Sequence, residues 1–162
     1  MKLLPSLLIV ALSVAAPVAA ADQPKFDFAG FFIGRTHAES QIKVGFRKPV
    51  RHITDSVGRR AANGDLIPLD SIKEEGKPKK ERRWVVRPSG PNSFTAVMSE
   101  AVGPVRITID GPNARIRYKM KGGISIDQTL AMRDRKTLTN HVAAKKLGVR
   151  LGRLDGTIRK LD

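Results

Sequence analysis

Apolar and polar residues alternate most clearly in the second half of the chain. In residues 105–110 the apolar side chains are all Val or Ile and share one face of an extended segment. Residues 114–120 repeat the alternation and carry Arg and Lys on the opposite face. A period of two predicts half-buried strands. Because Asp-Gly-Pro-Asn at 110–113 favours a tight turn, the two strands should form a hairpin.

Similar but weaker alternation predicts strands elsewhere. The other candidate strands are residues 36–44, 50–57, 66–72, 82–87, 94–98 and 124–132. Turns rich in Gly and Pro separate these segments at intervals of about 10 to 15 residues, which is typical of an all-β barrel or sandwich. About eight strands joined in order by short turns predict a single antiparallel up-and-down barrel or a curled meander.

Little of the chain has a helical pattern. Only residues 141–147 are expected to form a single helical piece. The run Gly-Phe-Phe-Ile-Gly at 30–34 lacks the spacing of a phosphate-binding loop, so its aromatic pair is expected to close one end of the core.

The N-terminus has the pattern of a cleavable signal peptide. Lys2 precedes a short apolar run, and small residues follow at 15–21. Pro5 and Pro17 bracket an apolar core too short for a membrane span. Residues 1–21 are therefore expected to be removed, which leaves residues 22–162 as one domain. The signal-peptide pattern predicts a periplasmic or secreted protein. Because cysteine is absent, we expect no lipid anchor.

The strong positive charge favours anionic partners. The chain carries 30 Lys and Arg against 15 Asp and Glu, a formal charge of +15. With 5% aromatic residues and no recognition motif, nucleic acid is not expected as a partner. Outside the cytoplasm the candidate partners are anionic lipid headgroups, lipopolysaccharide, peptidoglycan and acidic proteins. At an anionic membrane surface, each exposed Lys or Arg contributes about 1 kcal/mol. Alternatively, the charge serves only solubility.

No constellation of residues predicts a catalytic or metal site. His37, His52 and His141 lack metal-ligand spacing, and no nucleophile elbow is present. Glu74 and Glu75 lie among lysines and are expected at a solvated hairpin tip. No cofactor or metal is expected.

The single Trp of the chain is expected to belong to the interior. Trp84 should pack inside the barrel, while Arg82 and Arg83 face water. The alternative is a guanidinium stacked on the indole ring.

Short motifs recur in a characteristic order from Phe26 to Lys160. They are residues 31–34, 82–86, 90–96, 100–104, 110–114, 117–118, 138–141, 146–149 and 159–160. This order resembles the DUF3833 family, bacterial envelope proteins of unknown function that are often lipoproteins. The resemblance implies a calycin-like or lipocalin-like barrel. The chain departs from the family in lacking the lipoprotein Cys and in having Asp-Gln-Thr-Leu at 127–130 where an acidic pair followed by Trp is expected.

Three functions remain open. The favoured one is non-enzymatic binding of a lipid or other amphiphile inside the barrel. The residues expected to line the cavity are Trp84, Ile107, Ile109, Ile116, Tyr118, Ile124 and Ile126. The second is an enzyme that acts on an envelope lipid or small molecule in the barrel mouth, and a buried Asp127 with a shifted pKa would favour it. The third is a structural partner of another envelope protein, which a large exposed apolar patch would favour.

Overall fold

The predicted hairpin in the second half of the chain is confirmed. A computed structural model describes residues 25–162. Every second residue of β6 (Val105–Asp110) is buried, and β7 (Asn113–Met120) buries Ala114 and Ile116 in the same way. The two strands pair in antiparallel register with Ile107 opposite Ile116. Their buried faces therefore continue one another across the sheet.

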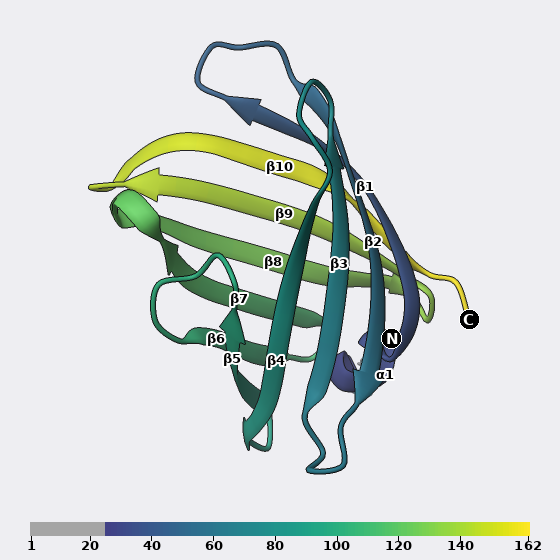
Figure 1. Ribbon diagram of the computed structural model, residues 1–162. Coiled ribbons are helices and arrows are strands. Elements are labelled where there is room, and N and C mark those ends of the chain that lie inside the picture. The colour runs from purple at the N-terminus through teal and green to yellow at the C-terminus, as the bar shows by residue number, and fades with distance from the viewer. Residues whose placement is uncertain (1–24) are drawn as a thin grey trace, which may run out of the picture.

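The described residues form an all-β barrel of ten antiparallel strands (Figure 1). The remaining strands are β1 (Gly34–Val44), β2 (Val50–Arg60), β3 (Leu66–Glu74), β4 (Lys80–Gly90), β5 (Ser93–Met98), β8 (Ile124–Asp134), β9 (Thr137–Lys146) and β10 (Val149–Lys160). Each strand pairs with its neighbours in the chain, and β10 pairs with β1 to close the barrel. The predicted up-and-down barrel is confirmed.

Two features of the C-terminal part differ from the sequence prediction. The barrel has ten strands rather than about eight, because β9 and β10 were not predicted. The helix expected at 141–147 is wrong, since residues through Lys146 belong to β9. A seven-residue helix is marginal by itself, whereas β9 pairs along its length with β8 on one side and β10 on the other.

A short helix, α1 (Phe28–Phe32), closes one end of the barrel, as the aromatic pair at 31–32 predicted. The Asp27 carboxylate caps α1 by accepting a hydrogen bond from the Gly30 amide at 2.9 Å. Phe26, Phe28 and Phe31 are buried, and the ring of Phe28 lies 5.4 Å from that of Phe94 on β5. The main apolar core therefore lies at the α1 end.

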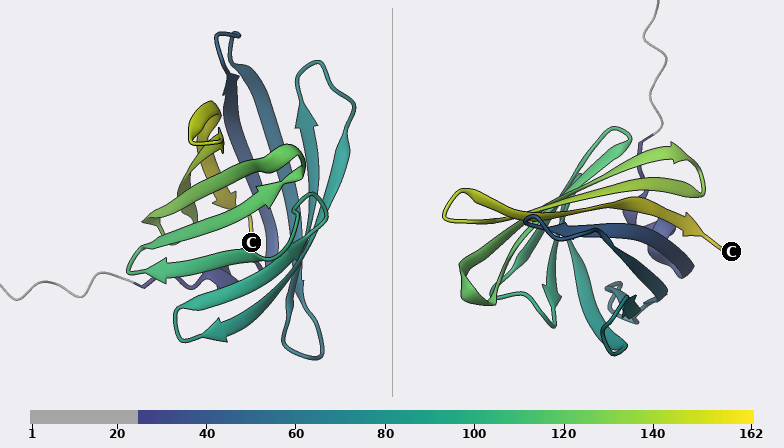
Figure 2. Two further views of the ribbon diagram at one scale, coloured as in Figure 1. Left: turned by 90° about the vertical axis from the view of Figure 1, so that its left-hand side faces the viewer. Right: turned by 90° about the horizontal axis from the view of Figure 1, so that it is seen from above.

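The opposite end of the barrel has no such cap among residues 25–162. Because successive strands alternate in direction, the loops after β1, β3, β5, β7 and β9 all lie at this end. The loop after β7 is a 3₁₀ turn, η1 (Lys121–Gly123). Figure 1 shows these loops toward the top and left and α1 at the lower right, and Figure 2 shows the same ribbon from two further sides.

One sequence expectation is not addressed by this part of the structure. The expected signal peptide, residues 1–21, lies outside the described residues. Within residues 25–162, no helix is long and apolar enough to cross a membrane.

Candidate ligand-binding cavity

A cavity of about 250 Å³ lies inside the barrel between α1 and the open end. Inward-facing side chains of β1–β4 and β7–β10 line it. Side chains two residues apart on a strand lie about 6.7 Å apart along it. The position of each lining residue along its strand therefore gives its depth in the cavity.

The floor of the cavity, at the α1 end, is mainly apolar. Phe28 and Phe32 of α1 meet Val86 of β4, Leu130 of β8 and Ile158 of β10. Leu130 is fully buried, and Val86 is 2% exposed. An apolar group that reaches this floor leaves water without desolvating a charge.

Uncharged donors and acceptors surround the middle of the cavity. The Gln128 amide donates a 2.8 Å hydrogen bond to the Asn140 carbonyl oxygen across β8 and β9. On the opposite wall, the Trp84 indole donates to Asp70 at 2.9 Å. Trp84 also meets the ring of Tyr118 edge-on, with ring centroids 6.4 Å apart. At this depth the lining of the cavity is therefore polar, in contrast to the apolar floor.

Asp70 is the buried carboxyl group at this level. It is 8% exposed. Burial raises the pKa of Asp70, although hydrogen bonds from Trp84 and Ser56 partly oppose the rise. The fold therefore favours the protonated form of Asp70 more than water does.

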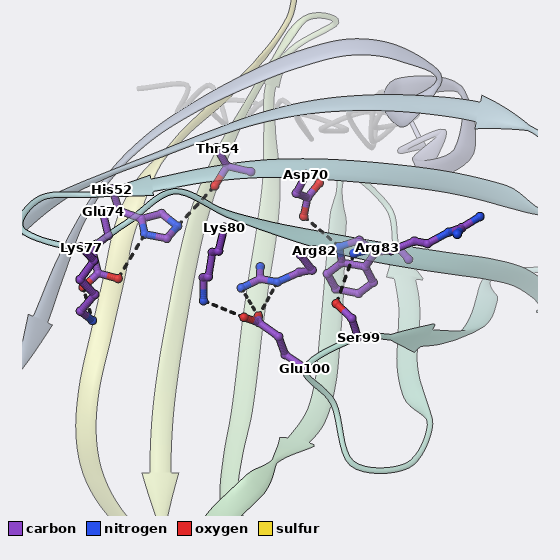
Figure 3. Close-up of polar contacts among 11 residues, drawn as sticks. His52, Thr54, Asp70, Glu74, Lys77, Lys80, Arg82, Arg83, Ser99 and Glu100 are labelled. Carbon is purple, nitrogen blue, oxygen red and sulfur yellow. Dashed lines mark hydrogen bonds and ion pairs between the residues drawn. The ribbon is translucent and has the colours of Figure 1, made fainter.

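Charged side chains gather at the mouth of the cavity, as Figure 3 shows. Lys80 donates to Glu100 at 2.6 Å, and the guanidinium of Arg82 lies 2.5 Å from the same carboxylate. Burial opposes ionisation of Glu100, but its hydrogen bonds with Lys80 and Arg82 and their charges outweigh it and lower the pKa of Glu100. Two cations thus share one anion, which leaves an excess positive charge.

His52 and Glu74 form a second polar pair near the mouth (Figure 3). His52 Nδ1 lies 3.9 Å from Glu74, which Lys77 holds at 2.6 Å. The Nε2 atom lies 3.3 Å from the Thr54 hydroxyl, whereas buried Nδ1 has no hydrogen-bond partner among residues 25–162. Burial lowers the pKa of His52, so the ring favours its neutral form.

Three of the seven expected lining residues lie at this cavity. Trp84, Ile116 and Tyr118 line it. Ile107 and Ile109 are buried in the core of β6 instead, where they contact no described cavity. Ligand binding by any of the seven stays a prediction.

The remaining two expected lining residues lie on β8. Ile126 is 7% exposed and buried. Ile124 is half-buried at the start of the strand. Neither lines the cavity.

The structure corrects two expectations about charged residues and tests one condition set for the enzyme hypothesis. Arg82 does not face water, because it lies on the same strand face as Trp84, and only Arg83 points outward. Glu74 is not a solvated tip residue, since its side chain is 14% exposed. The condition that would have favoured an enzyme, a buried Asp127 beside the cavity, is not met, because Asp127 does not line the cavity. Its hydrogen bonds with Arg115 on β7 lower its pKa.

The polar lining was missed because its residues occupy inward positions that the pattern assigns to apolar side chains. His52, Ser56 and Asp70 interrupt the alternation of β2 and β3, so those strands gave weak signals. The position along the strand could have revealed Asp70. It lies an even number of residues from Leu66 and Ile72, which are buried, and so shares their inward face. Among residues 25–162, no group of three or more His, Asp or Glu side chains is placed to hold a metal ion.

We expect Asp70→Asn to stabilise the protein at neutral pH. Because the folded-state pKa of Asp70 is raised, its contribution to stability is greatest below its ordinary pKa and falls as pH rises through the folded value. Asparagine retains an oxygen that can accept from Trp84 and carries no charge. The free energy of unfolding, measured with urea, should exceed the wild-type value at pH 7.5, and the difference should vanish near pH 3.5. Parallel pH profiles would contradict this account.

A ten-stranded up-and-down barrel with one capped end, one open end and an internal cavity defines a lipocalin-like protein. The chain belongs to a family described as protein of unknown function (DUF3833), whose model matches residues 7–160. The resemblance carried by the sequence motifs is therefore confirmed. No curated protein matches the chain.

Two solved structures share the fold at low sequence identity. The S-type phycobiliprotein lyase from Guillardia theta is 7% identical with a TM-score of 0.66, over 83% of this chain and 90% of that one. A DUF3598 family protein of unknown function from Nostoc punctiforme is 9% identical with a TM-score of 0.64. That match covers 85% of this chain and 50% of the Nostoc chain. These likenesses establish the lipocalin-like barrel.

Proposed function

We propose that the protein is an exported, non-enzymatic binder of a small single-chain amphiphile with an anionic headgroup. One observation carries the proposal: the cavity is apolar at its closed end and charged at its open end. An amphiphile that enters tail first would place its chain on the floor and its headgroup at the mouth. The signal-peptide pattern of residues 1–21 supports action outside the cytoplasm.

The size of the cavity favours a small ligand. Pockets that hold drug-sized molecules measure roughly 300–1,000 Å³, and about 250 Å³ lies just below that range. A single alkyl chain suits this volume better than a two-chain phospholipid. The open end leaves room for a headgroup in contact with water.

The charges at the mouth favour an anionic headgroup. Arg82 has five N–H donors, and its contacts with Glu100 are made through Nε and Nη2. Donor capacity therefore remains for a second carboxylate or a phosphate, which a guanidinium binds through charge-assisted hydrogen bonds. Lys80 adds a further donor near Arg82. The Nδ1 atom of His52, which has no hydrogen-bond partner among the described residues, is another donor when Nδ1 carries the proton.

The arrangement of the titratable groups favours binding over catalysis. Asp70 and His52 both have shifted pKa values, a feature of many catalytic pairs. Each is bonded to a different partner, however, and no hydrogen bond joins the two. Asp70 is held by Trp84 and Ser56, which is the bonding expected of a buried acid that serves the packing of the wall.

Paired ligands and paired variants test the proposal. Isothermal titration calorimetry with dodecanoate should show binding to the wild type, and Arg82→Gln should weaken it roughly ten- to a hundredfold, since hydrogen bonds to charged groups contribute about 1.5–3 kcal/mol. Dodecanol, which has the same chain and no charge, should bind both proteins alike. Arg83→Gln removes an equal charge from the outer face of β4 and should leave both affinities unchanged.

Two outcomes would overturn the proposal. Failure of both ligands to bind the wild type would reject an amphiphile cavity. Equal weakening of dodecanoate by Arg82→Gln and by Arg83→Gln would show that overall charge, rather than a headgroup site, controls affinity.

A further inference from the structure

The open end of the barrel carries exposed apolar side chains at its loop tips. We define the open rim as residues 43–49, 75–80, 99–104, 119–123 and 145–150. Phe46 and Leu147 are 108% and 95% exposed, which makes them the two most exposed large hydrophobic residues described. Val44, Val102 and Val149 on the same rim are at least half exposed. Of the nine exposed large hydrophobic residues among residues 25–162, the rim thus holds five, whereas the other four lie on the outer wall or at the C-terminus.

The two most exposed tips belong to loops that adjoin a pair of neighbouring strands. Phe46 lies in the loop after β1 and Leu147 in the turn after β9, and β10 pairs with β1 up to Val44 and Gly152. The Gly45 amide donates to the Leu151 carbonyl oxygen at 3.0 Å. Both tips therefore adjoin strands that pair with each other, β1 and β10, and lie at the open end of the barrel.

Basic residues surround these apolar tips. The rim contains eleven Lys or Arg and only two Glu, Glu75 and Glu100. At the α1 end, by contrast, acidic partners accompany the basic residues: Asp65 binds Arg87 at 2.7 Å, and Asp162 accepts from the Arg35 amide. The turns at the α1 end, residues 59–65, 87–92, 110–113, 133–137 and 159–162, hold eight Lys or Arg against four Asp. Among the described residues, the open rim therefore has the larger excess of positive charge, and it also holds the two most exposed apolar side chains.

We propose that the open rim docks on an anionic phospholipid bilayer. Phe46 and Leu147 enter the headgroup region, and the surrounding Lys and Arg side chains meet the lipid phosphates. Isolated apolar tips set among basic residues are the pattern of interfacial membrane binding, whereas a protein partner would be met by a contiguous apolar patch. Docking in this way places the cavity mouth against the bilayer, so that, on the proposed function, a ligand passes between the two without crossing water.

Vesicle binding with matched variants tests the docking. In co-sedimentation, the wild type should bind vesicles that contain phosphatidylglycerol and bind pure phosphatidylcholine vesicles weakly. Added salt should weaken the binding because it screens the basic residues over about 8 Å at physiological strength. Phe46→Ser with Leu147→Ser should weaken binding about tenfold or more. Val57→Ser with Val97→Ser removes two exposed apolar residues of the outer wall and should have no effect.

A fluorescence measurement reports the position of the tip. Phe46→Trp should give emission that shifts to the blue on phosphatidylglycerol vesicles and is quenched by brominated phosphatidylglycerol. Trp84, inside the barrel, should respond to neither in the wild type. An unshifted, unquenched Trp at position 46 would overturn the docking.

The docking and the ligand site can fail separately. The Phe46→Ser and Leu147→Ser variant should bind dodecanoate in solution as the wild type does, and Arg82→Gln should still bind vesicles. Loss of vesicle binding by the outer-wall variant as large as that of the rim variant would overturn the proposed rim, whatever the result with dodecanoate.

Discussion

Ile116→Trp should abolish binding of dodecanoate while leaving the barrel folded. Ile116 is 4% exposed and lines the cavity from β7, opposite Ile107 of β6. An indole at this position extends into the cavity of about 250 Å³ and takes up the space that an alkyl chain requires. We expect calorimetry to show a loss of affinity of more than about tenfold, equivalent to about 1.4 kcal/mol.

The stability of this variant distinguishes a cavity from a filled core. In a close-packed interior the larger side chain costs roughly 1–3 kcal/mol through overpacking, whereas an open cavity accepts it at little cost. Val97→Trp, on the exposed outer face of β5, adds the same side chain without entering the cavity and should bind dodecanoate normally. A stable Ile116→Trp variant with unchanged affinity would reject the cavity.

The sequence predicted the strands that bury apolar residues in strict alternation. β6 and β7 were clear because Val105, Ile107 and Ile116 repeat at a period of two. β9 and β10 were missed because their inward positions include Asn140 and Gly156, which bury little apolar area. At Gly156 a side chain would lie 2.2 Å from the Glu39 carbonyl oxygen of β1. The close approach of β10 to β1, which closes the barrel, thus requires Gly156. Because glycine has no side chain, it interrupts the alternation of apolar residues by which a strand is predicted.

The polar side of the cavity could not be predicted from the pattern alone. Trp84 and Tyr118 were expected inside because they are aromatic residues on apolar faces. Arg82 was expected to face water because it is charged, although it lies two residues from Trp84 and therefore on the same face of β4. Its burial depends on Glu100, which follows β5 and reaches Arg82 across the antiparallel β4–β5 pair. A charge is tolerated at an inward position where a partner from another element compensates its desolvation, and one strand's sequence does not contain that partner.

Gly58→Ala should strongly destabilise the protein by displacing α1. A Cβ atom at Gly58 would lie 1.7 Å from the Phe32 carbonyl oxygen and 2.9 Å from its carbonyl carbon. Both atoms belong to the backbone at the end of α1, so no rotation of a side chain relieves the overlap. We expect the free energy of unfolding to fall by about 3 kcal/mol, the upper end of the range for overpacking.

Denaturation with urea measures this effect, and Val57→Ala is the matched control. Val57 adjoins Gly58 on β2 but faces outward and is 58% exposed, so its truncation should change stability by no more than about 0.5 kcal/mol. If Gly58→Ala proves as stable as the wild type, the Phe32 carbonyl group of α1 does not lie against Gly58 of β2. Because Phe28 and Phe32 form the cavity floor, a variant that folds with α1 displaced should also bind dodecanoate and dodecanol more weakly. Equal loss for both ligands is expected here, since the floor contacts the alkyl chain and not the headgroup.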